Sequence, residues 1–222
     1  MLYYPTIIRM TFEKNKENMK EFAFLAARRP GFPPRMLVVQ GALFGVGMIG
    51  VAWLIVVVSH AQSAAAWFPR QTWQIDLLIG ALAGAAFALG VWRLLDYVPP
   101  LRQIERLVAR LLDMDALRPR HALLLGLVAG IPEEILFRGA IQPLIGLAGA
   151  SLLFGALHAL TPAYFVYASA AGFLLGGLAI WRGGLWASIA AHVVIDALML
   201  LLMMRGWRRS HPARLSDGHD RS

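Results

Sequence analysis

The amino-acid sequence predicts an all-α membrane protein, built as a polytopic transmembrane helical bundle of about six spans with one interfacial amphipathic helix. Two observations support this fold class. First, 58% of the 222 residues are hydrophobic and 15% are charged, whereas about 25% of the residues of an average soluble domain are charged. Second, apolar runs of about 20 residues, the length that crosses a bilayer, recur along the chain. The lipid bilayer is therefore the first expected partner.

The apolar runs divide the chain into a membrane domain and two tails. The tail at 1–35 lacks the apolar core of a cleavable signal peptide, so we expect it to be retained. The membrane domain covers 36–204, and a basic tail follows at 205–222. The expected spans are 36–59, 75–95, 121–144, 147–160, 163–181 and 185–204, of which the fourth is short.

Two further segments have features of helices at the bilayer surface. In the connector at 96–120, Leu101, Ile104 and Val108 recur at helical spacing opposite a row of arginines, which predicts the interfacial amphipathic helix. The stretch 12–28 fits either a surface helix or an ordinary solvated helix.

The basic residues indicate an orientation rather than a nucleic-acid partner. The two tails and the 96–120 connector hold seventeen Lys and Arg, whereas the loops on the opposite side hold only Arg70 and Arg182. Because short basic loops stay in the cytoplasm, both termini are predicted to be cytoplasmic. The net charge of +8 shows no basic face interleaved with aromatic residues, so we expect no nucleic acid to bind. The Ala- and Arg-rich composition favours a bacterial plasma membrane.

The third expected span carries three ionisable residues, Glu133, Glu134 and Arg138. An ionised side chain at the bilayer centre costs roughly 2.5–3.5 kcal/mol even by the lower estimates, so these residues need partners or a wet cavity. Glu134 and Arg138 are one helical turn apart and are expected to form an ion pair. Adjacent helical positions point about 100° apart, which leaves Glu133 as the better catalytic candidate. The opposite pairing, with Glu134 as the catalytic group, stays open.

Two later spans add further polar side chains. Phe154 precedes His158 by one turn, and a lone histidine at a helix end is more often structural than catalytic. His192 and Asp196 are spaced i, i+4 and share one helical face. Unpaired polar groups are costly in lipid, so the sets on the three spans are expected to converge. One Glu, two His and one Asp can activate water or bind a divalent metal, and both arrangements favour hydrolysis.

Other protease chemistries do not fit the sequence. The chain has no cysteine, which excludes disulfides, Cys-bound zinc and thiol catalysis. It also lacks the HExxH motif of zinc proteases, the serine arrangement of rhomboid-like proteases and the paired aspartates of presenilin-like proteases.

At these residues the chain resembles the CPBP intramembrane protease family, which includes CAAX prenyl endopeptidases and bacteriocin-processing or immunity proteins. The family pattern has three motifs in order. EExxxR matches Glu133, Glu134 and Arg138; FxxxH matches Phe154 and His158; HxxxN or HxxxD matches His192 and Asp196. The resemblance covers about 120–200, and the three motifs together are far more specific than any one of them.

The resemblance implies an α-helical membrane endopeptidase acting on a peptide or protein substrate. It assigns water activation to Glu133, shared with Glu134 in one version, together with His158. Arg138 and Phe154 become supporting residues. His192 and Asp196 would stabilise the oxyanion or, in another view, ligate zinc together with His158. Asn can donate a hydrogen bond to an oxyanion but an ionised Asp cannot, so Asp196 favours metal ligation or orientation of His192.

Two alternatives stay open, a proton- or ion-coupled transporter and a non-catalytic immunity protein that captures a peptide. The sequence does not specify the substrate or the oligomeric state. The span boundaries also raise a conflict, because Glu133 lies about 18 Å into its span while His158 lies two residues from the cytoplasmic end of the next. We therefore expect a kink at Pro132 or a fourth span that continues past Leu160.

Overall fold

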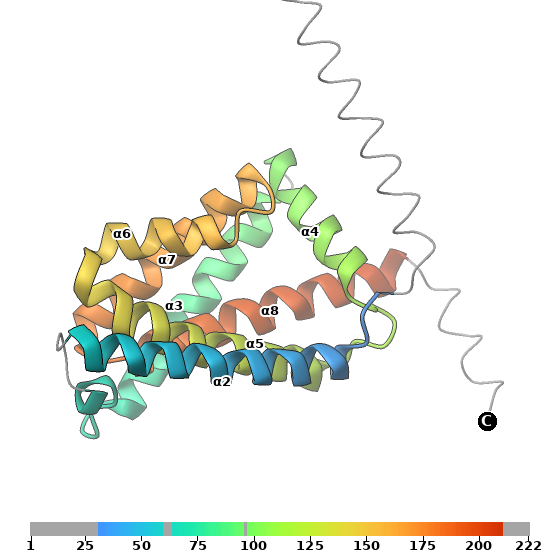
Figure 1. The fold of residues 1–222 in the computed structure, drawn as a ribbon. Coiled ribbons are helices and arrows are strands. Elements are labelled where there is room, and N and C mark those ends of the chain that lie inside the picture. Colours follow the sequence, from blue (N-terminus) through green and yellow to red (C-terminus); the bar gives the residue numbers. More distant parts are fainter. Residues whose placement is uncertain (1–30, 60–63, 96, 211–222) are drawn as a thin grey trace, which may run out of the picture.

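The structure is a computed structural model that describes residues 31–59, 64–95 and 97–210. Its elements are α2 (Pro34–Ser59), a short 3-10 helix η1 (Ala64–Trp67), α3 (Trp73–Leu94), α4 (Pro99–Leu111), α5 (Pro119–Glu134), a π-helical segment η2 (Ile135–Ile141), α6 (Gln142–Leu157), α7 (Pro162–Arg182) and α8 (Trp186–Ser210). The expected all-helical bundle is confirmed (Figure 1). The possible surface helix at 12–28 and most of both tails lie outside the described residues.

Within the described ranges, five helical elements are long and apolar enough to cross a membrane. One of them, Pro119–Leu157, contains a reversal at Gly146, whose φ of 75° and ψ of 172° are not helical. Glycine suits this position because residues with a side chain rarely adopt positive φ. After the reversal α6 runs back beside α7 (Figure 1). The third and fourth predicted spans are therefore the two arms of this element.

The helices approach closely at small residues. Gly80 and Gly84 of α3 pack on the backbone of Ala187 and Ala191 in α8, so these two helices run parallel. Gly172 of α7 packs on Ser151 of α6. Small residues are the usual means of close packing between helices in a membrane, where no hydrophobic force drives helices together. The described glycine pairs serve packing within the bundle.

The predicted amphipathic helix is confirmed as α4, which lies apart from the central helices (Figure 1). None of its residues is fully buried. Where α4 ends, Phe32 donates its N–H to the Leu111 carbonyl at 2.8 Å, and Asp113 donates back to Phe32 at 3.2 Å. This short bridge ties the beginning of α2 to the end of α4. The two helices thereby frame one side of the bundle.

Candidate active site

Glu134 and Arg138 form the buried base of the site. Their side chains make an ion pair of 2.8 Å between Oε1 and Nη1, with the expected i, i+4 spacing. Glu134 is 0% exposed and Arg138 is 4% exposed. Arg138 also donates from Nη2 to the Gly172 carbonyl at 3.2 Å, and its guanidinium lies 4.8 Å from the centre of the Phe154 ring. The pair therefore links the end of α5 to α6 and α7.

The segment that follows the two glutamates is a π-helix, η2. Such segments are rare and are frequently found at functional sites. Pro132 precedes it inside α5 and has no N–H to give to the preceding turn of the helix. Gly45 of α2 packs against the Pro132 ring, which fixes α2 at the level of the glutamates.

His192 of α8 is held by Glu134. Its Nδ1 lies 2.8 Å from Glu134 Oε1, the same oxygen that accepts from Arg138. An ionised carboxylate only accepts hydrogen bonds, so Nδ1 carries the proton. In the neutral ring, Nε2 then keeps a lone pair. That lone pair faces Asp196 Oδ2 at 3.6 Å and Glu133 Oε2 at 3.8 Å.

His158 is oriented in a similar way by the backbone. It caps the C-terminus of α6, and its Nδ1 lies 2.8 Å from the carbonyl oxygen of Phe154. A carbonyl accepts only, so Nδ1 is again the donor and Nε2 keeps the lone pair. The Phe154 ring packs on the imidazole, with 4.4 Å between ring centres. Phe154 thus contacts both His158 and Arg138, in agreement with a supporting position.

Glu133 lies where these groups meet. Its Oε2 is 3.8 Å from Nε2 of His158 and 3.8 Å from Nε2 of His192. These distances exceed a hydrogen bond, and this buried oxygen has no hydrogen-bond partner among the described residues. An orphaned acceptor between two lone-pair nitrogens leaves space for a small molecule that donates to two of these three acceptors, and water has the required size and its two donors.

The sequence placed Glu133 and His158 at different depths in the membrane. The shortness of the fourth span, which is α6, removes this difference. Glu133 lies thirteen residues before the reversal at Gly146, and His158 lies twelve residues after it. From Leu147 to Leu157 a helix rises roughly 16 Å, about half of the hydrocarbon thickness. The expectation that this span continues past Leu160 was wrong, because α6 ends at Leu157 inside the bundle. α5 continues through Pro132 into η2.

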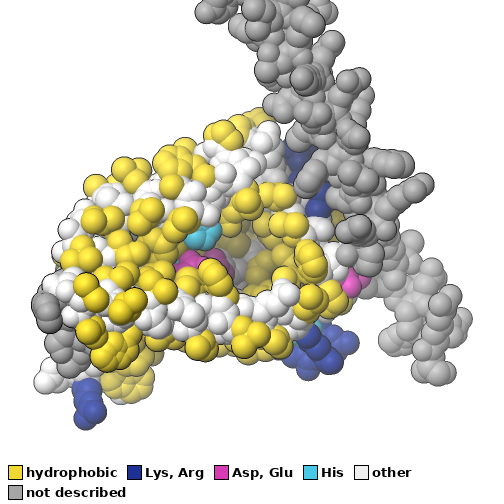
Figure 2. Space-filling model, in the orientation of Figure 1, with side chains coloured by type: hydrophobic (Ala, Val, Ile, Leu, Met, Phe, Trp, Pro, Cys, Tyr) yellow, Lys and Arg dark blue, Asp and Glu magenta, His cyan; other side chains and the backbone are white. Residues whose placement is uncertain are grey.

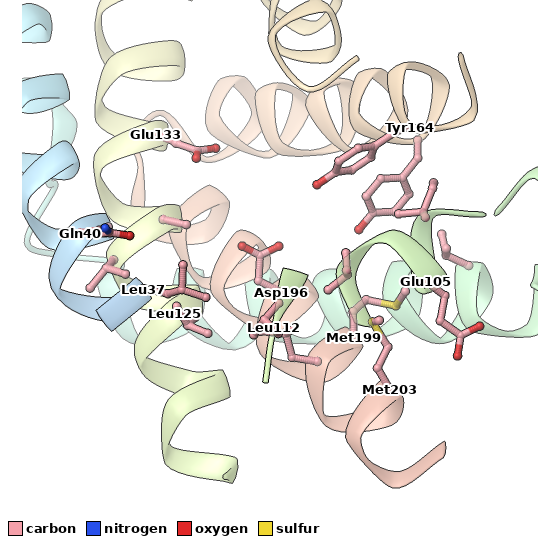
Figure 3. A pocket seen from close by; sticks show the side chains of 18 of the residues that line it. Leu37, Gln40, Glu105, Leu112, Leu125, Glu133, Tyr164, Asp196, Met199 and Met203 are labelled. Atoms are coloured by element: carbon pink, nitrogen blue, oxygen red, sulfur yellow. The ribbon is translucent and has the colours of Figure 1, made fainter. Parts of the chain in front are cut away.

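A cavity of about 540 Å³ leads to Glu133 and Asp196. Its walls come from α2, α3, α4, α5, α7 and α8 and are mostly apolar, with Leu37, Phe44, Val108, Leu125, Met199 and Met203 among them. Figure 2 shows the hollow on the side of the bundle, with acidic and histidine side chains at its inner edge. Figure 3 shows Glu133, Asp196 and Tyr164 extending into the same space. The polar groups are therefore reached through an apolar space from the side of the helices.

The donor atoms are of the types that bind a divalent metal. Nε2 of His158, Nε2 of His192 and the Asp196 carboxylate, the expected metal ligands, lie around one space. Imidazole nitrogens and carboxylate oxygens are ordinary zinc ligands. Among the described residues, however, no three or more His, Asp or Glu side chains are arranged closely enough to form a ready metal site.

Sequence reasoning missed several residues near the site. Tyr164 and Tyr167 of α7 and Glu105 of α4 line the cavity. At the far end of α7, Arg182 pairs with the buried Asp76. Thr161 and Pro162 form a typical helix start, with Thr161 as the N-cap of α7. This pattern could have indicated that Tyr164, in the first turn of α7, lies near His158. The Asp76 pair joins residues 106 positions apart, and no local pattern indicates it.

Part of the chain matches a known protein family. Residues 117–198 match the family model described as type II CAAX prenyl endopeptidase Rce1-like. The resemblance to the CPBP family is thus confirmed for this part of the chain, which contains all three motifs.

A curated relative has a similar region. It is described as uncharacterized protein YpbD of Bacillus subtilis (strain 168) and is 42% identical over 81 residues, which cover 35% of this chain and 43% of the relative. The chain thus matches less than half the length of that relative. No solved structure matches the chain.

Proposed function

We propose that the protein is an intramembrane endopeptidase that hydrolyses a peptide bond of a membrane-associated protein or peptide. The observation that carries this proposal is the unpartnered Glu133 Oε2 between two Nε2 atoms, each at 3.8 Å. The Rce1-like family match over 117–198 supports the same chemistry.

The proposed reaction uses a water molecule held between Glu133 and His158. The Glu133 carboxylate accepts a proton from this water while the oxygen attacks the peptide carbonyl carbon. The resulting tetrahedral intermediate carries the negative charge on the former carbonyl oxygen. Glu133 then returns the proton to the amide nitrogen, the C–N bond breaks, and the products are a new carboxyl terminus and an amine.

The other predicted residues position this pair. Glu134 and Arg138 fix the Nδ1 proton of His192, and Asp196 lies beside the Nε2 atom of that ring. A bound divalent metal such as Zn²⁺ would take His158, His192 and Asp196 as ligands and would polarise the carbonyl oxygen or the water. Glu133 itself carries out both proposed proton transfers.

The shape of the cavity suggests how a substrate arrives. Its opening lies on the side of the helices and its walls are apolar (Figure 2). We propose that an apolar peptide segment enters from the bilayer, between α2 and α4, in a plasma membrane with both termini of the enzyme in the cytoplasm.

The test is cleavage of membrane-associated peptides by the purified protein in lipid vesicles, with and without a chelator. We expect cleavage by the wild type, and loss of cleavage in Glu133→Gln and His158→Ala with unchanged thermal unfolding. Loss in chelator that returns on adding Zn²⁺ would support the metal-assisted version. Wild-type cleavage rates in the Glu133→Gln variant would overturn the proposal. Ion flux across the vesicles that depends on Asp196, without cleavage, would favour the transporter alternative, and peptide binding without cleavage the immunity-protein alternative.

A further inference from the structure

The groups assigned to the reaction leave the tetrahedral oxyanion one donor short, because position 196, where an amide would donate, holds the acceptor Asp196. Ionised Glu133, Glu134 and Asp196 only accept hydrogen bonds. Arg138 is engaged by Glu134 and the Gly172 carbonyl. Both histidines use their Nδ1–H on Phe154 and Glu134, so each can donate to the oxyanion only from Nε2, and only when that atom carries a proton. The oxyanion of a peptide hydrolysis nevertheless needs a positioned donor.

Three described side chains that line the cavity can donate a hydrogen bond: Gln40, Tyr164 and Tyr167. Gln40 is on α2, five residues before Gly45, which packs at the level of Pro132, so it lies about 7 Å further along that helix. Tyr167 packs against Phe87 of α3, with 5.9 Å between ring centres. Tyr164 instead packs edge-on against His158, at 6.0 Å between ring centres. Only Tyr164 has its ring against a proposed catalytic group.

Tyr164 is also held rigidly. The Thr161 side chain caps α7 by accepting the Tyr164 N–H at 3.1 Å, and Pro162 begins the helix. The turn from His158 to Thr161 is short, so His158 and Tyr164 have a fixed relation. Tyr167 stacks on Tyr164 from the next turn, with 5.9 Å between ring centres. A donor fixed before the substrate binds needs no reorganisation during the reaction, which is what makes such donors effective.

We propose that the Tyr164 hydroxyl donates the hydrogen bond that stabilises the oxyanion of the tetrahedral intermediate. The hydroxyl has no hydrogen-bond partner among the described residues and extends into the cavity with Glu133 and Asp196 (Figure 3). It supplies the donor that an amide side chain would give at position 196, where this chain has the acceptor Asp196. This inference rests on the proposed peptidase function.

The first test compares Tyr164→Phe with Tyr167→Phe, a matched loss of one hydroxyl from the same helix. Tyr164→Phe should lower kcat about 10²-fold, the usual effect of removing one oxyanion donor, while KM changes less than about twofold because the contact forms mainly in the transition state. Tyr167→Phe should keep wild-type kinetics. Unchanged kcat in Tyr164→Phe, with an active wild type, would overturn the inference and leave the proposed function standing.

A second test does not depend on turnover. A phosphinic peptide carries tetrahedral, anionic oxygens in place of the scissile bond, and its binding can be followed by tryptophan fluorescence. Tyr164→Phe should weaken its binding about tenfold or more, the fold-change for losing a hydrogen bond to a charged group. Binding of the parent peptide in the Glu133→Gln background should stay unchanged. Equal binding of the phosphinic peptide by wild type and Tyr164→Phe would contradict the assignment, even in a protein that cleaves nothing.

Discussion

Asp76 and Glu133 are both acidic residues inside apolar helices, but their surroundings differ. Asp76 is 1% exposed and accepts from Thr72 Oγ1 at 2.6 Å and from Arg182 Nε at 2.5 Å. Glu133 Oε2 has its nearest nitrogens at 3.8 Å and no hydrogen-bond partner among the described residues. The first acid is saturated and joins α3 to α7. The second keeps its capacity for a ligand, so the two acids differ chiefly in their hydrogen-bond partners.

The largest expected effect on cleavage is at Glu133. Glu133→Gln should lower kcat by about 10²–10⁴-fold, because the amide cannot accept the proton of the water. Its thermal unfolding should change little, since Glu133 Oε2 has no hydrogen-bond partner to lose among the described residues. Asp76→Asn should show the reverse, with wild-type kcat per folded molecule and a lower unfolding temperature. Peptide cleavage and thermal unfolding should be measured for both variants in the same detergent. If both variants lose cleavage, or both lose thermal stability, the proposed difference between the two acids is refuted.

A second expected effect concerns Glu134, which lies beside Glu133 and whose Oε1 accepts hydrogen bonds from both Arg138 and His192. Arg138→Leu should destabilise the protein by about 3–5 kcal/mol, because it leaves a buried carboxylate without its cation. The double variant Glu134→Leu/Arg138→Leu should recover much of this loss, since apolar pairs can replace buried ion pairs. It should still fail to cleave peptide, because His192 loses the acceptor of its Nδ1 proton.

Denaturant unfolding in detergent measures these stabilities. A double variant that is no more stable than Arg138→Leu would show that the ion pair is not the source of the loss.

The smallest expected effect is at Thr72, the second partner of Asp76. Thr72→Val keeps the shape of the side chain but removes one hydrogen bond, so we expect a loss of about 1 kcal/mol and unchanged cleavage. Arg182 still pairs with Asp76 in this variant. A loss as large as that of Asp76→Asn, measured by the same unfolding experiment, would mean that Thr72 and not Arg182 holds the acid.

Much of the fold followed from the sequence because membrane helices are local structures. The bilayer requires each span to satisfy its own backbone and to be apolar over a known length. The boundaries of α2, α3 and α7 were therefore predicted within a few residues. Helix α4 was predicted from its apolar face and the opposite face of arginines. The orientation of the termini stays a prediction.

The sequence by itself predicted that Glu133, His158, His192 and Asp196 converge, because polar side chains in apolar helices are costly without partners. Their chemical roles stay predictions. The tertiary structure decided the rest. It placed Glu133 level with His158 by reversing the chain at Gly146 and ending α6 half-way through the bundle. It also brought Tyr164 beside His158 and Arg182 to Asp76. These contacts depend on where a helix stops and which helices pack together, and neither is contained in the spacing of residues along one helix.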